Sequence, residues 1–293
     1  MIKKKTITGV IIGVICGLVQ VCTENALAQD VIKIAGSSTI RPVVTAASVP
    51  FGKANSVTFE IEGGGSSHGV KSVATGKVDI GDASRHLKDK EKRQWPDLVP
   101  HLIGNDGVAI ILNKALGITA ITKKQVQDIY TGKVRNWEEI GGPDEPIYLV
   151  SKEHGRSTLE LFLKYSGLEV EERGIQMVHR VKGEKEFSSV KARIIGSNQG
   201  AIIQAARKRG SIAYVSVGDA LFFAEKTKKI ILPSLDGIEA TKENISNGTF
   251  PITRVLNVVT NGPPNGTVKK FIDYLLSPEG QNFVVAGNFL PVK

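Results

Sequence analysis

Short runs of β-branched residues alternate with helical stretches along most of this chain, and that alternation restricts the fold more than any other feature. Residues 31–35 predict a first strand, which is followed by a helix with Pro42 in its first turn, where proline is tolerated. Residues 56–61 and 78–81 predict further strands, each followed by small polar residues. Strands that alternate with helices predict an α/β architecture with mainly parallel sheets.

The middle and the end of the chain continue this pattern. Residues 98–103 and 108–113 predict two strands separated by a turn at residues 104–107. Thr122 and Gln125 form a capping box, which predicts that a helix begins there and runs to Tyr130. Later strands are expected over residues 147–151, 212–216 and 253–260, and later helices over residues 198–207 and 268–276.

Four of the expected strand-to-helix junctions carry hydroxyl or glycine residues. They are Ser37-Ser38-Thr39, Ser66-Ser67, Ala83-Ser84 and Gly155-Arg156-Ser157-Thr158. In an open α/β sheet such junctions gather at the carboxyl ends of the strands, where ligands bind. A helix amino terminus offers free N–H groups and a partial positive charge, and hydroxyls add further donors. Each junction alone is explained by helix capping, but four together predict one shared anion site.

The first 28 residues have the three-part pattern of a secretory signal peptide. Three lysines precede an apolar run over residues 10–21, and Ala26-Leu27-Ala28 gives a cleavage signature. The run is shorter than the ~20 apolar residues that a membrane anchor needs. We therefore expect cleavage after Ala28 and a periplasmic protein. A lipid anchor at Cys22 is the weaker option, because Val21 stands where a small residue is expected.

Composition excludes several classes of function. Cys16 and Cys22 both lie in the leader, so the mature chain is expected to have no disulfide and no thiol chemistry. Loss of the leader lowers the formal charge from +9 to +7, a balance that attracts anions without naming a partner. No aromatic and basic motif typical of nucleic-acid modules is present. The five histidines show no metal-ligand spacing, and no metal or cofactor is expected.

Several blocks of this sequence resemble, in order, the phosphate-binding proteins of bacterial ABC importers. The resemblance rests on Gly36–Thr39 with Pro42, on residues 65–71, on Asp79-Ile80-Gly81 and on residues 106–113. It continues through residues 122–142, 197–202 and 212–218, and thus covers nearly the whole mature chain. Residues 122–142, with Asn136-Trp137 and Gly141-Gly142, form its most specific stretch.

The resemblance implies the two-lobed periplasmic-binding-protein fold, of the second type, with two mixed, mainly parallel sheets and hinge strands near Leu112 and Arg254. Lobe I would hold residues 29–112 plus 254–293, and lobe II residues 113–253. The family's ligand contacts, carried over by position, fall on Thr39, Ser66, Ser84, Lys152, Arg156, Ser157 and Thr158. We add Ser38, which neighbours Thr39 at the same helix start. The implied role is capture of inorganic phosphate by a monomer that delivers it to an ABC permease in the inner membrane.

Two departures from the family pattern bear on the ligand. Lys152 stands where the family has an arginine, so Arg156 either restores the guanidinium or points outward. Ser84 stands where some members have an aspartate, which accepts the proton of hydrogen phosphate and repels sulfate. Asp82, Asp106 or Glu153 are alternative acceptors. Phosphate is therefore the first candidate, and sulfate or another tetrahedral oxyanion remains open.

Two other functions compete with transport. Gly65-Ser66-Ser67-His68-Gly69 satisfies the Gly-x-Ser-x-Gly elbow of serine hydrolases, which would place the nucleophile at Ser67. However, such enzymes have their histidine late in the chain, and here the last histidine is His179. We therefore do not expect an enzyme. A protein of the same fold that senses an anion without transporting it is the second alternative.

Overall fold

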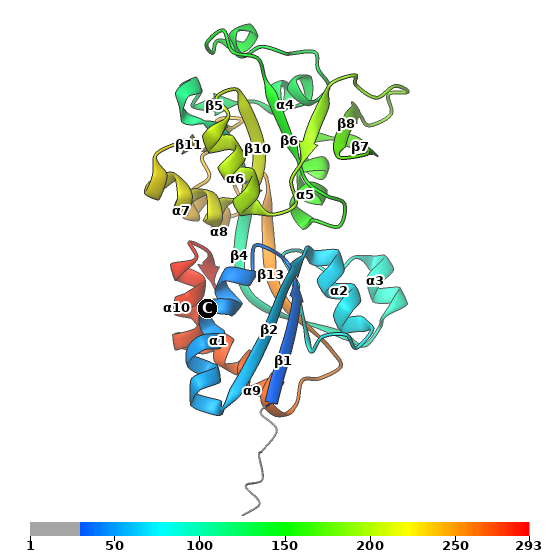
Figure 1. The fold of residues 1–293 in the computed structure, drawn as a ribbon, viewed down its shortest axis with the longest axis vertical. Helices are drawn as coiled ribbons and strands as arrows, with labels where there is room; N and C mark the ends of the chain where they lie inside the picture. The colour runs from blue at the N-terminus through cyan, green and yellow to red at the C-terminus, as the bar shows by residue number, and fades with distance from the viewer. Residues whose placement is uncertain (1–29, 293) are drawn as a thin grey trace, which may run out of the picture.

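The computed structural model describes residues 30–292 and has two lobes joined by two long strands, β4 (Leu98–Asn113) and β13 (Thr253–Asn261) (Figure 1). The expected signal peptide, both cysteines and Lys293 lie outside the described residues. Within residues 30–292, no helix combines the length and apolar character needed to cross a membrane. The expected boundaries between the lobes, one between residues 112 and 113 and one between residues 253 and 254, remain a prediction.

Lobe I, the lower body in Figure 1, is a sheet with helices on both faces. Its elements are β1 (Asp30–Gly36), α1 (Arg41–Asn55), β2 (Val57–Gly64), α2 (Ser66–Ala74), β3 (Ile80–Ala83), α3 (Asp89–Gln94), α9 (Gly266–Leu276), α10 (Pro278–Ala286) and β14 (Leu290–Pro291). Apolar side chains of α1, α9 and α10 pack on one face, and those of α2 pack on the other. Pro42 lies in the first turn of α1, as expected.

Lobe II has the same layered plan. Its first elements are η1 (Lys114–Leu116), β5 (Ala120–Ile121), α4 (Lys123–Tyr130), η2 (Trp137–Ile140), β6 (Tyr148–Ser151), α5 (Ser157–Ser166), β7 (Leu168–Arg173), β8 (Gln176–Val181) and β9 (Lys191–Ile194). They are followed by α6 (Asn198–Arg207), β10 (Ser211–Ser216), α7 (Val217–Thr227), β11 (Ile230–Ile231), β12 (Ser234–Leu235) and α8 (Lys242–Ser246). The predicted capping box is confirmed, because Thr122 Oγ1 accepts a hydrogen bond from the Gln125 N–H and the Gln125 side chain accepts one from the Thr122 N–H.

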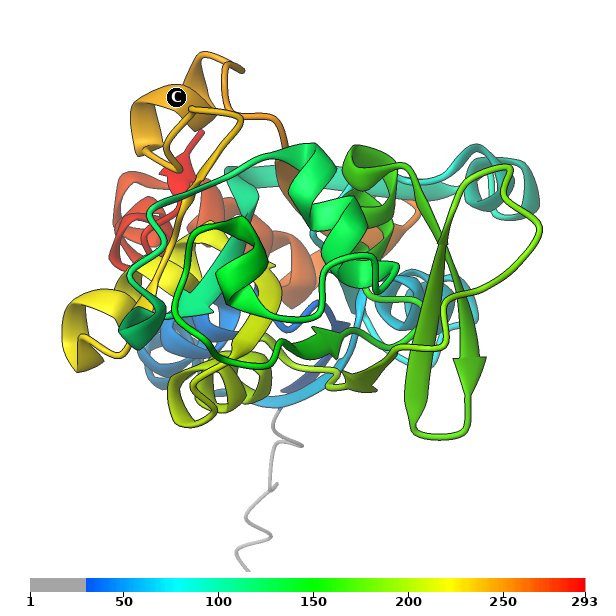
Figure 2. The same cartoon turned by 90° about the horizontal axis from the view of Figure 1, so that it is seen from above.

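The strands are mixed in direction, and the two expected sheets are continuous through β4. The order is β2-β1-β3-β13-β4-β10-β6-β9-β8-β7. Pairs β1–β2, β1–β3, β6–β10 and β6–β9 are parallel. The antiparallel pairs come mainly from the crossing strands and from the β7–β8 hairpin, which the sequence did not predict and which lies at the edge of lobe II in Figure 2.

One expectation about β4 is wrong: residues 98–113 form a single strand, without a turn at residues 104–107. Strand β4 pairs with β13 up to Gly107 and with β10 from Val108 onward, so one strand serves both lobes. Its glycines provide close packing and do not make a turn. A Cβ on Gly104 would lie 2.8 Å from the Leu290 carbonyl oxygen, and one on Gly107 would lie 3.1 Å from that of Ile252.

Candidate functional site

Hydroxyl groups from both lobes meet at the centre of the molecule. Ser84 Oγ lies 2.8 Å from Ser37 Oγ and 3.4 Å from Ser66 Oγ, both in lobe I. It also lies 2.6 Å from Ser157 Oγ, at the start of α5 in lobe II. These hydroxyls belong to residues that are at most 3% exposed. The junctions predicted to converge do converge, and we call Ser37, Thr39, Ser66, Ser84, Ser157 and Thr158 the hydroxyl cluster.

Glycine residues allow the lobe I junctions to approach one another. Gly36 ends β1 with φ +139°, in a backbone region that favours glycine. A Cβ on Gly69, in α2, would lie 2.6 Å from the Ala35 carbonyl oxygen, closer than real Cβ atoms come. The amino end of α2 therefore lies directly against the ends of β1 and β3. This packing brings Ser66 beside Ser84, whose N–H donates to Ser66 Oγ at 3.1 Å.

Arg254, on the crossing strand β13, contacts the hydroxyl cluster through its guanidinium group. Its Nη2 donates to Thr39 Oγ1 at 3.0 Å, and its Nη1 lies 3.4 Å from the hydroxyl oxygens of Ser84, Ser157 and Thr158. The 3.4 Å contacts are long for hydrogen bonds, so Nη1 retains most of its donor capacity. The sequence had placed Arg254 only as a hinge residue.

A buried carboxylate holds this arginine in place. Asp106 of β4 is the direct cross-strand partner of Arg254. Its Oδ2 lies 2.6 Å from Nη2 and 2.9 Å from Nε, and neither side chain is more than 1% exposed. Asp106 also accepts from Ser216 Oγ and from the Gly218 N–H. A buried ion pair with its remaining lone pairs hydrogen-bonded is the arrangement that low dielectric requires.

Lys152 adds a second buried cation to lobe II. It is 1% exposed, and its Nζ donates to the Ser197 carbonyl oxygen at 2.7 Å, beside the amino end of α6. The pKa of Lys152 is lowered to about 7, chiefly by burial and also by the charges of Arg156 and Arg254, while Asp219 and Glu153 oppose this shift. The amine therefore loses its proton far more readily than a solvated lysine. A nearby anion would restore its charge.

Three helices begin at the hydroxyl cluster without a side-chain cap. At α1, α2 and α5, no side chain of the N-cap residue accepts from the first turn. Of the helices that begin elsewhere, α4, α8 and α10 have such caps, from Thr122, Thr241 and Ser277, whereas α3 and α9 do not. The positive ends of three helix dipoles thus face the same place, which favours an anion.

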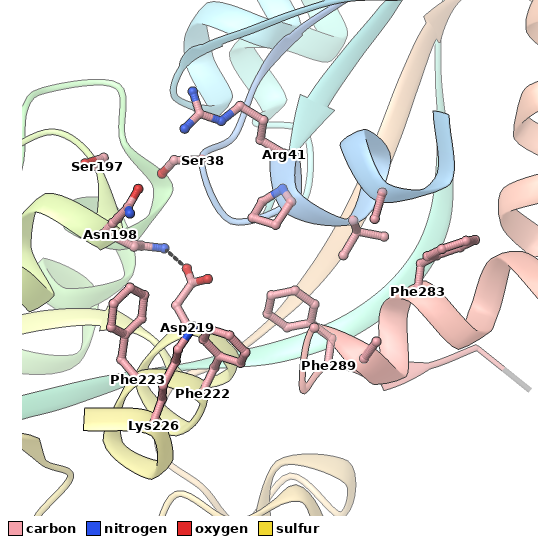
Figure 3. Close-up of a pocket in the computed structure, with 16 residues that line it drawn as sticks. Ser38, Arg41, Ser197, Asn198, Asp219, Phe222, Phe223, Lys226, Phe283 and Phe289 are labelled. Atoms are coloured by element: carbon pink, nitrogen blue, oxygen red, sulfur yellow. Dashed lines mark hydrogen bonds between the residues drawn. The ribbon is translucent and has the colours of Figure 1, made fainter. Parts of the chain in front are cut away.

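Besides Lys152, two predicted site residues lie outside the hydroxyl cluster. The Arg156 guanidinium pairs with Glu153 Oε2 at 2.6 Å, and the Arg156 side chain lies against Gly65 at the boundary between the lobes, which we call the cleft. Ser38 lines a neighbouring pocket of about 470 Å³ between α1 and α10 of lobe I and α6 and α7 of lobe II (Figure 3). The structure thus brings together Thr39, Ser66, Ser84, Ser157 and Thr158, with Lys152 in the adjoining wall, but not Ser38 or Arg156.

Asn198 links that pocket to the hydroxyl cluster and was also missed. Its side-chain amide donates to Thr39 Oγ1 at 3.0 Å and to Asp219 Oδ2 at 2.7 Å, and the second bond is drawn in Figure 3. Burial raises the pKa of Asp219 to about 6, although the bond from Asn198 lowers it. The sequence carried a signal for this residue, because Ser197-Asn198-Gln199 begins a helix and belongs to one of the blocks that resemble the family.

The three alternative proton acceptors have different surroundings. Asp106 is already occupied by Arg254, Ser216 and Gly218. Glu153 is exposed and pairs with Arg156. Asp82 is fully buried, and neither carboxylate oxygen has a hydrogen-bond partner among residues 30–292. Burial raises the pKa of Asp82 well above its ordinary value, so this side chain favours the neutral acid.

The serine-hydrolase elbow does not assemble a nucleophile and base within residues 30–292. Ser67 Oγ accepts from Arg85 Nη2 at 3.1 Å and lies 3.4 Å from Glu160 Oε1. The adjacent His68 instead contacts Ser72. Within the same residues, no group of three His, Cys, Asp or Glu side chains is placed to hold a metal ion.

Comparison with known proteins identifies the family of this chain. Residues 23–279 match the model of the PBP superfamily domain. The phosphate-binding protein PstS of Bacillus subtilis is 31% identical over 269 residues, covering 90% of this chain and 82% of the relative.

Solved structures are similar over the same range. A putative phosphate ABC transporter substrate-binding protein of Clostridium perfringens, with bound phosphate, is 32% identical with a TM-score of 0.76, covering 90% of this chain and all of that one. An ABC-type phosphate transport receptor of Vibrio cholerae, 22% identical with a TM-score of 0.65 and the same coverage of this chain, shares the fold. The chain belongs to the PBP superfamily and, within it, to the family of the phosphate-binding proteins PstS.

Proposed function

We propose that this protein captures inorganic phosphate between its lobes and delivers it to an ABC permease. One observation carries the proposal: hydroxyls from both lobes, three uncapped helix starts and the buried Arg254 converge on one point, and the buried Lys152 lies close enough to feel the charge of Arg254. Donors in such number, without a free carboxylate among them, suit a small, highly charged oxyanion. The names of the relatives in Bacillus and Clostridium support phosphate as that anion.

Each side chain has a distinct role in the proposed complex. Arg254 supplies the planar, permanently charged guanidinium that the resemblance implied at Lys152. Lys152 contributes a charge that the anion stabilises. Thr39, Ser66, Ser84, Ser157 and Thr158 donate hydroxyl hydrogen bonds from the two sides. Arg156 and Ser38 lie at the margin and contribute little.

Hydroxyls also supply the proton acceptor in this proposal. Hydrogen phosphate must donate one proton, and Asp106 is already committed to Arg254. A serine hydroxyl both donates and accepts hydrogen bonds, so Ser84, at the centre of the cluster, can accept the hydrogen bond from the P–OH group. Because no carboxylate charge repels sulfate there, discrimination against sulfate is the part of the proposal most open to test.

Calorimetric titration of the purified protein with phosphate and with sulfate provides that test. We expect tight phosphate binding and weaker sulfate binding. Equal affinities would favour the alternative, a general receptor for tetrahedral oxyanions. Absence of heat with both ions, supported by an unchanged melting temperature, would contradict anion capture altogether.

The remaining parts of the proposal are export, a monomeric state and the absence of enzymatic activity. The relatives are substrate-binding proteins, and Ser67 has no histidine contact among the described residues. A chromogenic ester should therefore not be hydrolysed; turnover that depends on Ser67 would restore the hydrolase hypothesis. Transport predicts that deletion of the gene lowers phosphate uptake by cells, whereas the sensing alternative predicts unchanged uptake.

A further inference from the structure

A second set of contacts joins the lobes at the rim of the cleft. Glu160, in the first turn of α5, accepts a hydrogen bond from Lys88 Nζ at 2.6 Å, and its other oxygen lies 3.1 Å from Arg85 Nε. Ser67 Oγ lies 3.4 Å from the same carboxylate. We call Ser67, Arg85, Lys88, Glu91 and Glu160 the rim cluster. Only Glu160 belongs to lobe II.

The lobe I side of the rim cluster is fixed by its own contacts. Glu91 binds Arg85 through both oxygens, at 2.7 and 2.8 Å, and Arg85 is 6% exposed. Asn257 of β13 also donates to the Arg85 carbonyl oxygen. Because these bonds lie within lobe I and its strand, they do not depend on closure of the cleft. Arg85 therefore holds its positive charge in a fixed place beside Glu160, although its Nε–H makes no hydrogen bond among the described residues.

Glu160 is coupled to the anion site through its helix. It follows Ser157 and Thr158, of the hydroxyl cluster, in the first turn of α5. Just before this turn, the Gly155 carbonyl oxygen accepts a hydrogen bond from the Ser67 N–H at 3.1 Å across the cleft. Any movement that separates the hydroxyls of α5 from lobe I also breaks the contacts of Glu160.

We infer that Glu160 is a positioning residue that holds the closed cleft and sets the rate at which bound phosphate is released. This inference rests on the proposed function. The Glu160 contacts must break before the anion leaves, so they slow dissociation. They form only after the anion has entered, so they affect association little. Because Glu160 is 27% and Lys88 45% exposed, salt weakens the pair.

Stopped-flow measurement of phosphate binding and release tests this role. In Glu160→Gln we expect the dissociation rate to rise about 3- to 10-fold, while the association rate stays within about twofold of wild type. Wild-type release should accelerate with added sodium chloride, and release from Glu160→Gln should depend less on salt. Glu160→Asp keeps the charge and should recover part of the wild-type rate.

Two further variants separate this role from a general charge effect. Glu184→Gln removes a comparable surface carboxylate, which pairs with Lys133 inside lobe II, and should leave both rates unchanged. Lys88→Gln should accelerate release. Adding it to Glu160→Gln should produce little further change, because each substitution removes the same Lys88–Glu160 ion pair.

The outcomes distinguish this inference from the proposed function. A wild-type protein that binds no phosphate contradicts the function itself. Wild-type binding with an unchanged release rate in Glu160→Gln, or an equal change in Glu184→Gln, overturns only the role of the rim cluster. A parallel fall in the association rate would overturn it as well, since Glu160 would then act on entry of the anion.

Discussion

Contacts at the centre of the cleft and contacts at its rim both join the two lobes, but the central charges are buried and the rim charges reach solvent. At the centre, Arg254 and Asp106 are at most 1% exposed and are surrounded by neutral hydroxyls. At the rim, Glu160 and Lys88 form an ion pair that water reaches, because both side chains are partly exposed. Charges removed from water are costly to leave unpaired, whereas solvated pairs contribute little. If the proposals above hold, the buried centre determines whether an anion binds, and the solvated rim adjusts how long it stays.

The largest expected effect comes from breaking the central pair. Arg254→Gln leaves Asp106 buried without its partner, so the free energy of unfolding should fall by about 3–5 kcal/mol and phosphate binding should be lost. Urea denaturation measures the first effect. Arg180→Gln, which breaks a partly exposed pair with Glu169, is the control and should cost less than about 1 kcal/mol. Equal losses in both variants would refute the distinction between the buried central pair and partly exposed pairs.

Thr39→Val should have the next largest effect. The variant keeps the shape of the side chain but removes a hydroxyl that contacts Arg254 and Asn198. Because a charged anion would lose a donor, phosphate affinity should fall by about 1.5–3 kcal/mol. Calorimetric titration measures this loss, and Thr227→Val, at the end of α7, should bind as wild type. Unchanged affinity in Thr39→Val would make Thr39 a structural residue alone.

The lowered pKa of Lys152 predicts that phosphate affinity depends on pH. Its pKa of about 7 means that the amine of the free protein is mostly neutral at pH 8, and a bound dianion raises that pKa. Binding at pH 8 should therefore take up protons. The contribution of Lys152 to affinity is complete below pH 7 and falls by up to about tenfold per pH unit above it. Titration in buffers of different ionisation enthalpy counts these protons. Lys152→Met should take up fewer, and equal uptake would assign the protons elsewhere.

The smallest effect is expected from Arg156→Gln. Arg156 pairs with the exposed Glu153 and makes no contact with the hydroxyl cluster. Phosphate affinity should therefore change by less than about threefold, because the Arg156 guanidinium is already paired with a carboxylate that reaches solvent. A loss as large as that of Thr39→Val would show that Arg156 moves inward when the anion binds and provides the guanidinium in place of Arg254.

Most of the fold could be predicted because local patterns determine it. The alternation of strands and helices, Pro42 and the Thr122 capping box all act within a few residues. The single long strand β4 could not, since Gly104 and Gly107 have the composition of a turn. Their role depends on Leu290 and Ile252, which come from distant parts of the chain.

The site was predicted where it consists of helix starts and missed where it depends on pairing between strands. Hydroxyls at strand-to-helix junctions are visible in the sequence, and their convergence follows from sheet geometry. Arg254 is one arginine in an apolar strand, and its partner Asp106 is 148 residues away. A single charge in each of two apolar strands was the available signal, because such charges need a partner once the strands are buried.

The register of Arg254 opposite Asp106 has a consequence for how the protein opens. Both residues lie on the two strands that connect the lobes, so a hinge in these strands would place them close to its axis. Points near an axis move least, so the guanidinium should keep its position and its carboxylate partner whether the cleft is open or closed. An arriving anion then meets a stationary charge first, and the hydroxyls of the two lobes swing in around it afterwards.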